Sequence, residues 1–261
     1  MSRAKIVLFA YSEVGYLCLE ELIKSGANIA AVFTHEDDPD EEIWFRSVKA
    51  LAEANNISVR TPKKLDENEV EYFKSLDPDL VLSFYYRALI PKAVLDVPRL
   101  GAYNIHGALL PKYRGRACVN WAVLNGEQET GATLHVMTEE ADRGDIVDRE
   151  AVSIEFTDTA HDVFLKVADA ARNIIARSLP LLEAGTAPRE PQDESEATYF
   201  GRRRPKDGEI DWNKSAVEIY NLIRAVTHPF PGAFTEFDGK KYFIWKARPL
   251  PGSAEPKAIV S

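Results

Sequence analysis

The feature that most constrains the fold is a series of short, apolar runs that alternate with helical patterns in the first half of the chain. The first run, KIVLFA at residues 5–10, is typical of a strand buried on both faces of a parallel sheet. Four more strands are predicted at residues 29–34, 57–60, 80–85 and 101–106. Helical patterns lie between them, at residues 15–24, 44–54 and 67–75. This alternation predicts an α/β fold built on a parallel sheet.

The second half predicts two more strands, a long helix and a small appendage. The strands are expected at residues 131–137 and 146–154, and the helix at 159–183. Its apolar stripe is formed by Val163, Val167, Ala170, Ile174 and Leu181. From residue 188 the composition shifts to Pro, Glu, Asp and Ser, which indicates a linker. A short helix at 216–226 and a hairpin at 233–245 follow. We therefore predict a catalytic domain at 1–190 and a short C-terminal subdomain at 200–261.

Composition and charge exclude several classes of protein. The hydrophobic content of 45% and the charged content of 28% are ordinary for a globular protein. The net charge of −9 argues against a general polyanion binder, because such proteins carry basic surfaces. With only Cys18 and Cys118, neither a disulfide framework nor a cysteine zinc site is expected. The apolar run at residues 6–10 is too short for a signal peptide or a spanning helix, so we expect a cytoplasmic protein without a membrane partner.

Two polar residues stand at the end of the strand predicted at 101–106. Asn104 and His106 are two positions apart, so the side-chain period of a strand places both on one face. An amide can donate to a developing oxyanion, and an imidazole can move a proton. Asp142, in the loop ADRGD at 141–145, would keep the imidazole protonated or correctly oriented. We predict Asn104, His106 and Asp142 as catalytic residues acting at a carbonyl group.

At these residues the chain resembles the folate-dependent formyltransferases, which move a formyl group from 10-formyltetrahydrofolate to an amine. The family pattern is Asn-x-His-x-Ser-Leu-Leu-Pro, then a basic Arg-Gly segment and a later aspartate. The residues that fit it are Asn104, His106, Leu109, Leu110, Pro111, Arg114, Gly115 and Asp142. Ala108 replaces the usual serine, so any hydrogen bond from that hydroxyl is missing here.

A subgroup of the family is more similar still. The blocks SFYYR at 83–87, LPKYRGR at 110–116, NGE at 125–127 and FGRR at 200–203 resemble the formyltransferase domain that acts on UDP-4-amino-4-deoxy-L-arabinose in lipopolysaccharide biosynthesis. The resemblance runs from about residue 5 to residue 235. It implies a Rossmann-like formyltransferase core with a small C-terminal helix-plus-hairpin appendage.

The resemblance also implies ligands and their positions. The formyl donor would be 10-formyltetrahydrofolate as a co-substrate, and no metal would be needed. The positions that match the family's folate contacts are Ala88, Leu89, Ile90, Arg116, Thr138, Glu139, Glu140, Ala141 and Asp142. Basic clusters beside a catalytic loop suit phosphates or carboxylates. We expect an acceptor that is a small nucleotide sugar, not a nucleic acid, held by Tyr11, Lys112, Arg114, Arg202 and Arg203.

Four alternative functions stay open, and a metal site is a fifth, weaker alternative. Methionyl-tRNA formyltransferases share the catalytic trio, but they bind polyanionic RNA and carry a C-terminal barrel for which the segment after residue 233 is too short. Formyltetrahydrofolate hydrolases use water as the acceptor and usually carry an extra N-terminal regulatory domain. A nicotinamide oxidoreductase is disfavoured because the turn at residues 10–15 lacks G-x-G-x-x-G, and a binding module because the trio is intact. The metal site would consist of His106, His135 and Asp142.

The hairpin predicted at residues 233–245 is a candidate homodimer contact.

Overall fold

The computed structural model describes residues 3–39, 41–250 and 258–260. The predicted domain ranges 1–190 and 200–261 also contain residues 1, 2, 40, 251–257 and 261, which lie outside the described residues. Among the described residues, no helix combines the length and the apolar character needed to cross a membrane.

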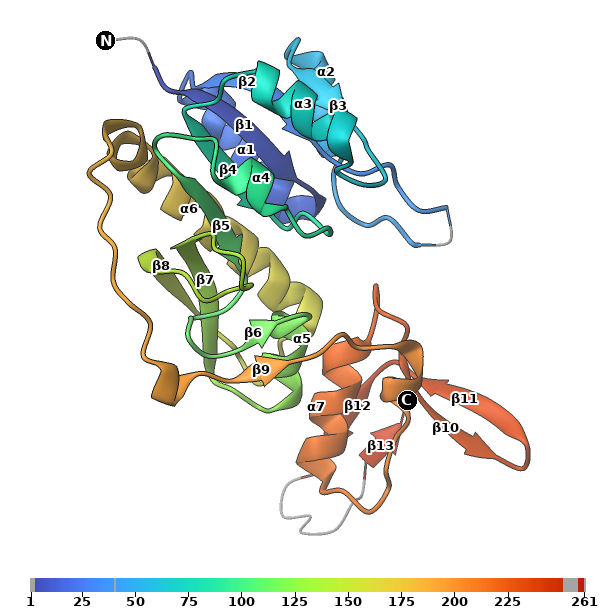
Figure 1. Ribbon diagram of the computed structural model, residues 1–261. Helices are drawn as coiled ribbons and strands as arrows, with labels where there is room; N and C mark the ends of the chain where they lie inside the picture. Colours follow the sequence, from blue (N-terminus) through green and yellow to red (C-terminus); the bar gives the residue numbers. More distant parts are fainter. Residues whose placement is uncertain (1–2, 40, 251–257, 261) are drawn as a thin grey trace.

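The core is a seven-stranded sheet with the order β3-β2-β1-β4-β5-β7-β8 (Figure 1). Its strands are β1 Lys5–Ala10, β2 Asn28–Phe33, β3 Ser58–Arg60, β4 Leu80–Phe84, β5 Ala102–His106, β7 Glu129–Val136 and β8 Ile146–Ser153. The strands β1 to β5 pair in parallel, whereas β7 is antiparallel to β5 and β8 is antiparallel to β7. The predicted α/β, Rossmann-like fold is confirmed, with one reversed strand, β7, next to the edge strand β8.

Helices cover both faces of this sheet. The larger buried cluster contains residues of α1 (Ser12–Lys24), α2 (Val48–Ala54) and α6 (Ala160–Ala184). The smaller cluster, on the other face, contains residues of α3 (Glu67–Ser75) and α4 (Lys92–Leu95). Because successive strand residues point to opposite faces, β1 contributes to both clusters.

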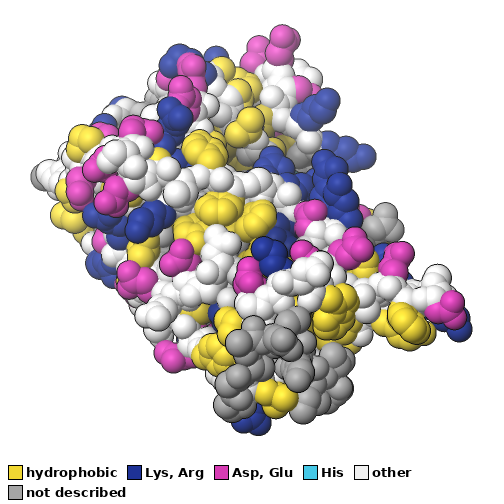
Figure 2. All heavy atoms as spheres, turned by 90° about the horizontal axis from the view of Figure 1, so that it is seen from below, with side chains coloured by type: hydrophobic (Ala, Val, Ile, Leu, Met, Phe, Trp, Pro, Cys, Tyr) yellow, Lys and Arg dark blue, Asp and Glu magenta, His cyan; other side chains and the backbone are white. Residues whose placement is uncertain are grey.

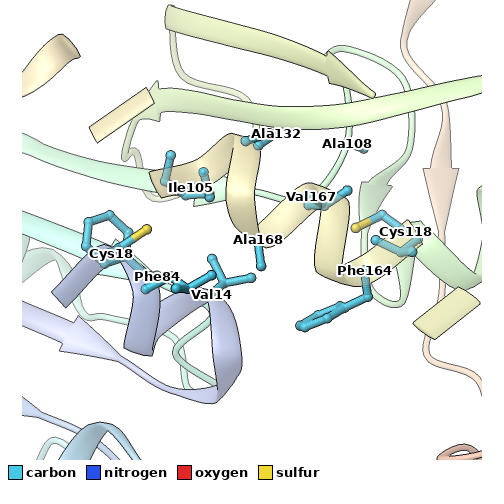
Figure 3. Packing of buried hydrophobic residues seen from close by; sticks show 14 of the residues in the cluster. Val14, Cys18, Phe84, Ile105, Ala108, Cys118, Ala132, Phe164, Val167 and Ala168 are labelled. Carbon is cyan, nitrogen blue, oxygen red and sulfur yellow. The ribbon is translucent and has the colours of Figure 1, made fainter. Parts of the chain in front are cut away.

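The helix α6 packs between α1 and the strands β7 and β8. Figure 3 shows Phe164, Val167 and Ala168 of α6 among side chains that come from α1, from the sheet and from α5 (Cys118–Leu124). The Thr159 hydroxyl caps α6 by accepting from the backbone N–H of Asp162. One member of the predicted stripe is wrong. Leu181 is 43% exposed, and Leu182 is buried in its place because the buried face continues through Ser178 and Leu179.

The predicted start of one helix is also wrong. The helix predicted from residue 44 begins only at Val48, because the Ser47 hydroxyl caps it by accepting from the N–H of Ala50. Trp44 lies before the helix and packs edge-on against Phe164 of α6. After β4 the chain turns sharply. Tyr85 has a left-handed φ of 57°, and α4 follows as a single short turn.

The segment predicted as a linker is docked on the catalytic domain. We call residues 185–204 the strap. It exchanges two backbone hydrogen bonds between Glu190 and Ile146. Its strand β9 (Tyr199–Phe200) then pairs in parallel with β6 (Arg114–Gly115), which lies in the loop after β5. The strap therefore forms one wall of the region around His106.

The C-terminal subdomain is the predicted helix and hairpin with one more strand pair. The helix α7 spans Ala216–Val226, as predicted, and Ser215 and Glu218 form a capping box at its start. The hairpin consists of β10 Ala233–Phe237 and β11 Lys240–Ile244, and it projects away from the rest of the chain (Figure 1). The extra pair is formed by β12 Ala247–Pro249 and β13 Ala258–Val260.

Candidate active site

Asn104 and His106 lie at the carboxyl end of β5, where ligands bind in open α/β sheets. Tyr103 and Ile105, the alternate residues of the same strand, belong to the larger buried cluster on the opposite face. His106 is 6% exposed, and its Nε2 lies 2.8 Å from the carbonyl oxygen of Tyr113. A carbonyl can only accept, so Nε2 donates this hydrogen bond. That leaves Nδ1 as the ring nitrogen that can exchange a proton with a bound substrate.

Asp142 approaches His106 from the loop between β7 and β8. Its Oδ1 lies 3.4 Å from Nδ1 of His106, and its Oδ2 accepts a 2.9 Å hydrogen bond from the backbone N–H of Gly115. Asp142 has a left-handed φ of 59°, which Asp tolerates better than most residues. The structure thus brings together the three residues predicted as catalytic, although they come from two separate parts of the chain.

A threonine on β7 fixes the loop that follows His106. The Thr133 hydroxyl donates to the carbonyl of Ala108 at 2.6 Å and accepts from the N–H of Leu110 at 3.1 Å. Ala108 itself is wholly buried, so the position where the family has serine carries a packed methyl group. The loop is therefore held by Thr133, a residue that the sequence analysis did not single out.

Arg114 is part of a buried polar network, which differs from its predicted contact with the acceptor. Its side chain is wholly buried, and its guanidinium donates to Glu194 at 2.7 and 2.9 Å and to Oε1 of Gln192 at 2.7 and 3.1 Å. The Gln192 amide in turn donates to the carbonyls of Asp142 at 2.9 Å and Gly144 at 2.7 Å. All three polar nitrogens of Arg114 are occupied, so this residue orients the Asp142 loop through the strap.

Sequence reasoning missed Gln192 and Glu194 because they lie in a stretch whose composition is typical of a linker. A second missed contact lies nearby, where the Tyr199 hydroxyl donates to the carbonyl of Ala141 at 3.0 Å. A third is the Thr198 hydroxyl, which accepts from the N–H of Tyr113 at 2.8 Å. Only the FGRR block at 200–203 signalled that this part of the chain reaches the site.

The two segments predicted to hold the folate lie side by side. Lys92, at the start of α4, is 3.3 Å from the carboxylate of Glu139. Before it, Ala88 and Leu89 are exposed, Leu89 to 80%, and Ile90 is half-buried. The loop 138–141 is shaped by the Thr138 hydroxyl, which donates to the carbonyl of Glu140 at 2.7 Å. Their backbone groups and the exposed side chain of Arg116 stay our candidates for donor contacts.

Tyr11 is buried and hydrogen-bonded within the protein, and it is not exposed to solvent. Its side chain is 3% exposed, and its hydroxyl donates to Asp37 at 2.9 Å. Burial, together with this hydrogen bond, raises the pKa of Tyr11 to about 12. The Arg87 guanidinium lies over the ring at 4.6 Å. Tyr11 thus holds the acidic loop after β2 against the sheet, and the acceptor contact predicted for it has no exposed surface to form on.

A group of cations follows the β6–β9 pairing, and we call it the cationic strip. Its members Lys112, Arg116, Arg202 and Arg204 are exposed, and within the described residues none of these side chains has a carboxylate partner. Figure 2 shows Lys and Arg side chains on the face of the molecule seen from below, with Asp and Glu side chains between them. On a chain with net charge −9, unpaired cations in one place are suited to bind an anion.

A cavity of about 240 Å³ lies beside the strip, between the catalytic domain and the C-terminal subdomain. Arg203 and Arg204 line it together with Asn120 of α5 and Phe230, which follows α7. Arg203 stacks over Trp121 at 4.7 Å and donates to the carbonyl of Asp207 at 2.8 Å, and burial lowers the pKa of its guanidinium. Asn104, His106 and Asp142 do not line this cavity, which is therefore a neighbouring compartment.

The weaker metal alternative is not supported by the geometry. His135 and His106 both face Oδ1 of Asp142, at 3.7 and 3.4 Å. In the described part of the chain, no group of three or more His, Cys, Asp or Glu side chains is arranged to hold a metal ion.

An amide donor, an imidazole and a carboxylate are groups that acyl transfer at a carbonyl can use. The comparison with known families identifies the family to which the chain belongs. The chain belongs to the formyl transferase family, because the family model described as formyl transferase matches residues 4–179. The model for the formyl transferase C-terminal domain matches residues 203–260, so the similarity extends beyond the end predicted near residue 235.

Solved structures share this fold at low sequence identity. The N-formyltransferase from Helicobacter canadensis, in complex with folinic acid and dTDP-3-aminofucose, has a TM-score of 0.77 and 22% identity, over 95% of this chain and 88% of that one. WlaRD, a sugar 3N-formyl transferase, has a TM-score of 0.74 and 22% identity, over 95% and 87%. HypX from Aquifex aeolicus, in complex with tetrahydrofolic acid, has a TM-score of 0.70 and 20% identity, over 98% of this chain and 40% of that one.

Proposed function

We propose that the protein transfers the formyl group of 10-formyltetrahydrofolate to the amine of a nucleotide-linked amino sugar, UDP-4-amino-4-deoxy-L-arabinose or a close relative. The observation that carries the proposal is the convergence of Asn104, His106 and Asp142 beside the unpaired cationic strip. Two similar structures, from Helicobacter canadensis and of WlaRD, were determined with a formylated folate and a dTDP compound, which supports this pairing of substrates.

The mechanism that we propose is direct acyl transfer. The neutral amine attacks the formyl carbon, and the Asn104 amide donates to the oxyanion of the tetrahedral intermediate. His106 takes the proton of the attacking amine at Nδ1, while Asp142 stabilises the imidazolium at 3.4 Å. The C–N bond to the folate then breaks, and the same proton passes to the folate nitrogen. One C–N bond forms, one breaks, and no oxidant or metal takes part.

The cationic strip is our candidate for the diphosphate of the acceptor. Lys112 and Arg202 are exposed and unpaired among the described residues, and Arg203 lies between the strip and the cavity. A nucleotide sugar that spans them would place its diphosphate on the strip and another part of the molecule in the cavity. Arg114 is excluded from this role because its side chain is wholly buried in its pair with Glu194.

The acceptor decides between this proposal and the alternatives. The protein is incubated with 10-formyltetrahydrofolate and, in parallel, with water alone, charged initiator methionyl-tRNA, and UDP-, GDP- and dTDP-linked amino sugars. Formylation of an amino sugar with tetrahydrofolate release that depends on it is expected. Efficient formylation of the tRNA, or release that is equally fast without an amine, would overturn the proposal.

Replacement of Arg202 by alanine is expected to raise the KM of the nucleotide sugar about tenfold with little change in kcat, because a phosphate contact made equally in the ground and transition states contributes about 1.4 kcal/mol of uniform binding. Arg3→Ala is the matched control, since Arg3 is also exposed and has no carboxylate partner among the described residues. Equal KM values for the two variants would remove the strip from the acceptor site.

The hairpin is our candidate for a homodimer contact. It exposes three aromatic side chains, Phe237 to 74%, Tyr242 to 48% and Phe243 to 49%. Large exposed apolar groups on a projecting element are typical of an interaction surface. Sedimentation equilibrium is expected to show a dimer that Phe237→Ser weakens, and a wild-type monomer at all concentrations would contradict the proposal.

A further inference from the structure

His135 on β7 is a buried histidine that the proposed mechanism does not use. It stands directly opposite Asn104 in the antiparallel pairing of β5 and β7, and it is 2% exposed. Side chains at opposed positions of two strands lie on the same face of the sheet and are close neighbours. The Nε2 of His135 is 3.1 Å from the Nδ2 of Asn104.

The hydrogen bonds of His135 determine the tautomer of its ring and the orientation of the Asn104 amide. Its Nδ1 lies 2.9 Å from the carbonyl oxygen of Val136, which can only accept, so Nδ1 carries a hydrogen. Burial lowers the pKa of His135 to about 4, against the opposing effect of Asp142, so the ring is neutral near pH 7. The Nε2 of a neutral ring with Nδ1–H is an acceptor. The group of Asn104 that faces it must therefore be the NH₂ and not the carbonyl oxygen.

This arrangement leaves one amide hydrogen of Asn104 available. One N–H is donated to His135, and the described residues provide no hydrogen-bond partner for the second. An amide that could rotate by 180° would present its carbonyl oxygen to the site half of the time, and an oxygen would repel a developing oxyanion. A fixed acceptor behind the NH₂ group removes that second orientation.

We propose that His135 is a positioning residue, which holds the Asn104 amide so that its free N–H points to the oxygen of the reacting formyl group. The inference rests on the proposed formyl transfer. The neutral ring forms no ion pair with Oδ1 of Asp142, which lies 3.7 Å away. That carboxylate therefore remains available to His106. Preorganised donors of this kind stabilise a transition state without reorganisation.

Two substitutions distinguish the loss of the hydrogen-bond acceptor at residue 135 from a change in packing. His135→Leu keeps a buried side chain of similar size without an acceptor, and His135→Gln restores an acceptor oxygen. Loss of a whole oxyanion donor costs about 10²–10³ in kcat, so loss of its orientation in His135→Leu is expected to lower kcat at least about tenfold. The KM values for both substrates are expected to stay within about twofold, and His135→Gln to recover most of the activity.

A double-mutant cycle tests whether His135 acts through Asn104. In an Asn104→Ala background, His135→Leu is expected to lower kcat no further than about twofold, because the two residues would share one effect. Full activity of His135→Leu, equal loss in the Leu and Gln variants, or effects that multiply in the cycle would each overturn the proposal.

A spectroscopic measurement keeps the inference separate from the proposed reaction. In the ¹⁵N spectrum of the wild-type protein, His135 is expected to be neutral with its proton on Nδ1 at pH 7, and the Asn104 side-chain amide to show slowed hydrogen exchange that His135→Leu removes. This result is expected even if the acceptor is not a sugar, whereas wild-type protein without any formyl transfer would refute the reaction alone. A charged His135 ring, or an Asn104 amide that exchanges freely, would overturn the positioning role.

Discussion

Replacement of His106 by alanine is expected to lower kcat for formyl transfer by at least about 10²-fold, the usual scale for a positioned acid–base group. Nδ1 of His106 is the ring nitrogen left free for proton transfer, since Nε2 donates to the carbonyl of Tyr113. Without the ring, the proton of the attacking amine has no carrier, and Asp142 at 3.4 Å loses the cation that it would stabilise. Single-turnover kinetics with saturating folate and acceptor measure the effect.

Two measurements make this result specific. Folate binding, followed by titration calorimetry, is expected to survive in His106→Ala, because the predicted donor contacts are backbone groups of residues 88–90 and Arg116. The control is His161→Ala on α6, a half-buried histidine that packs on Trp44 and is no part of the catalytic trio. Near-normal turnover of His106→Ala, with His161→Ala unchanged, would remove His106 from the chemistry.

The sequence was sufficient to predict the strand end with its pair of polar residues. A period of two is a local property of a strand, so Asn104 and His106 could be placed on one face without knowledge of the partners of β5. The same holds for α7, which was predicted at residues 216–226 from its local pattern and spans Ala216–Val226. Both predictions depended on neighbours in the chain, and both are confirmed in the structure.

The contacts that orient the site could not be predicted in this way. Arg114 meets Gln192 and Glu194 across a long separation in sequence, and the acidic composition of the strap suggested only a solvated linker. The direction of β7 and β8 is a further example, since an apolar run does not say whether it pairs in parallel. Tyr85, which turns the chain with a φ of 57°, is a non-glycine residue where no glycine signals the turn.

A turn glycine near Asp142 gives the largest expected effect on stability. A Cβ on Gly144 would overlap the carbonyl oxygen of Val136 in β7, and this backbone cannot withdraw freely because Val136 is paired with Tyr103 of β5. Gly144→Ala is therefore expected to lower the free energy of unfolding by about 3 kcal/mol, the upper range for overpacking of a tight site. Urea denaturation followed by circular dichroism measures this loss.

The same substitution is expected to lower kcat, because Gly144 lies two residues after Asp142 and its carbonyl accepts from Gln192 at 2.7 Å. A displacement of about 1 Å in a catalytic group can cost about 10²-fold in rate. Gly201→Ala is the matched control, since a Cβ there would meet nothing within 4 Å. If Gly144→Ala lowered the free energy of unfolding but not kcat, the turn would be able to shift while Asp142 stays in place. If Gly144→Ala matched Gly201→Ala in both measurements, the close packing of the turn against β7 would be wrong.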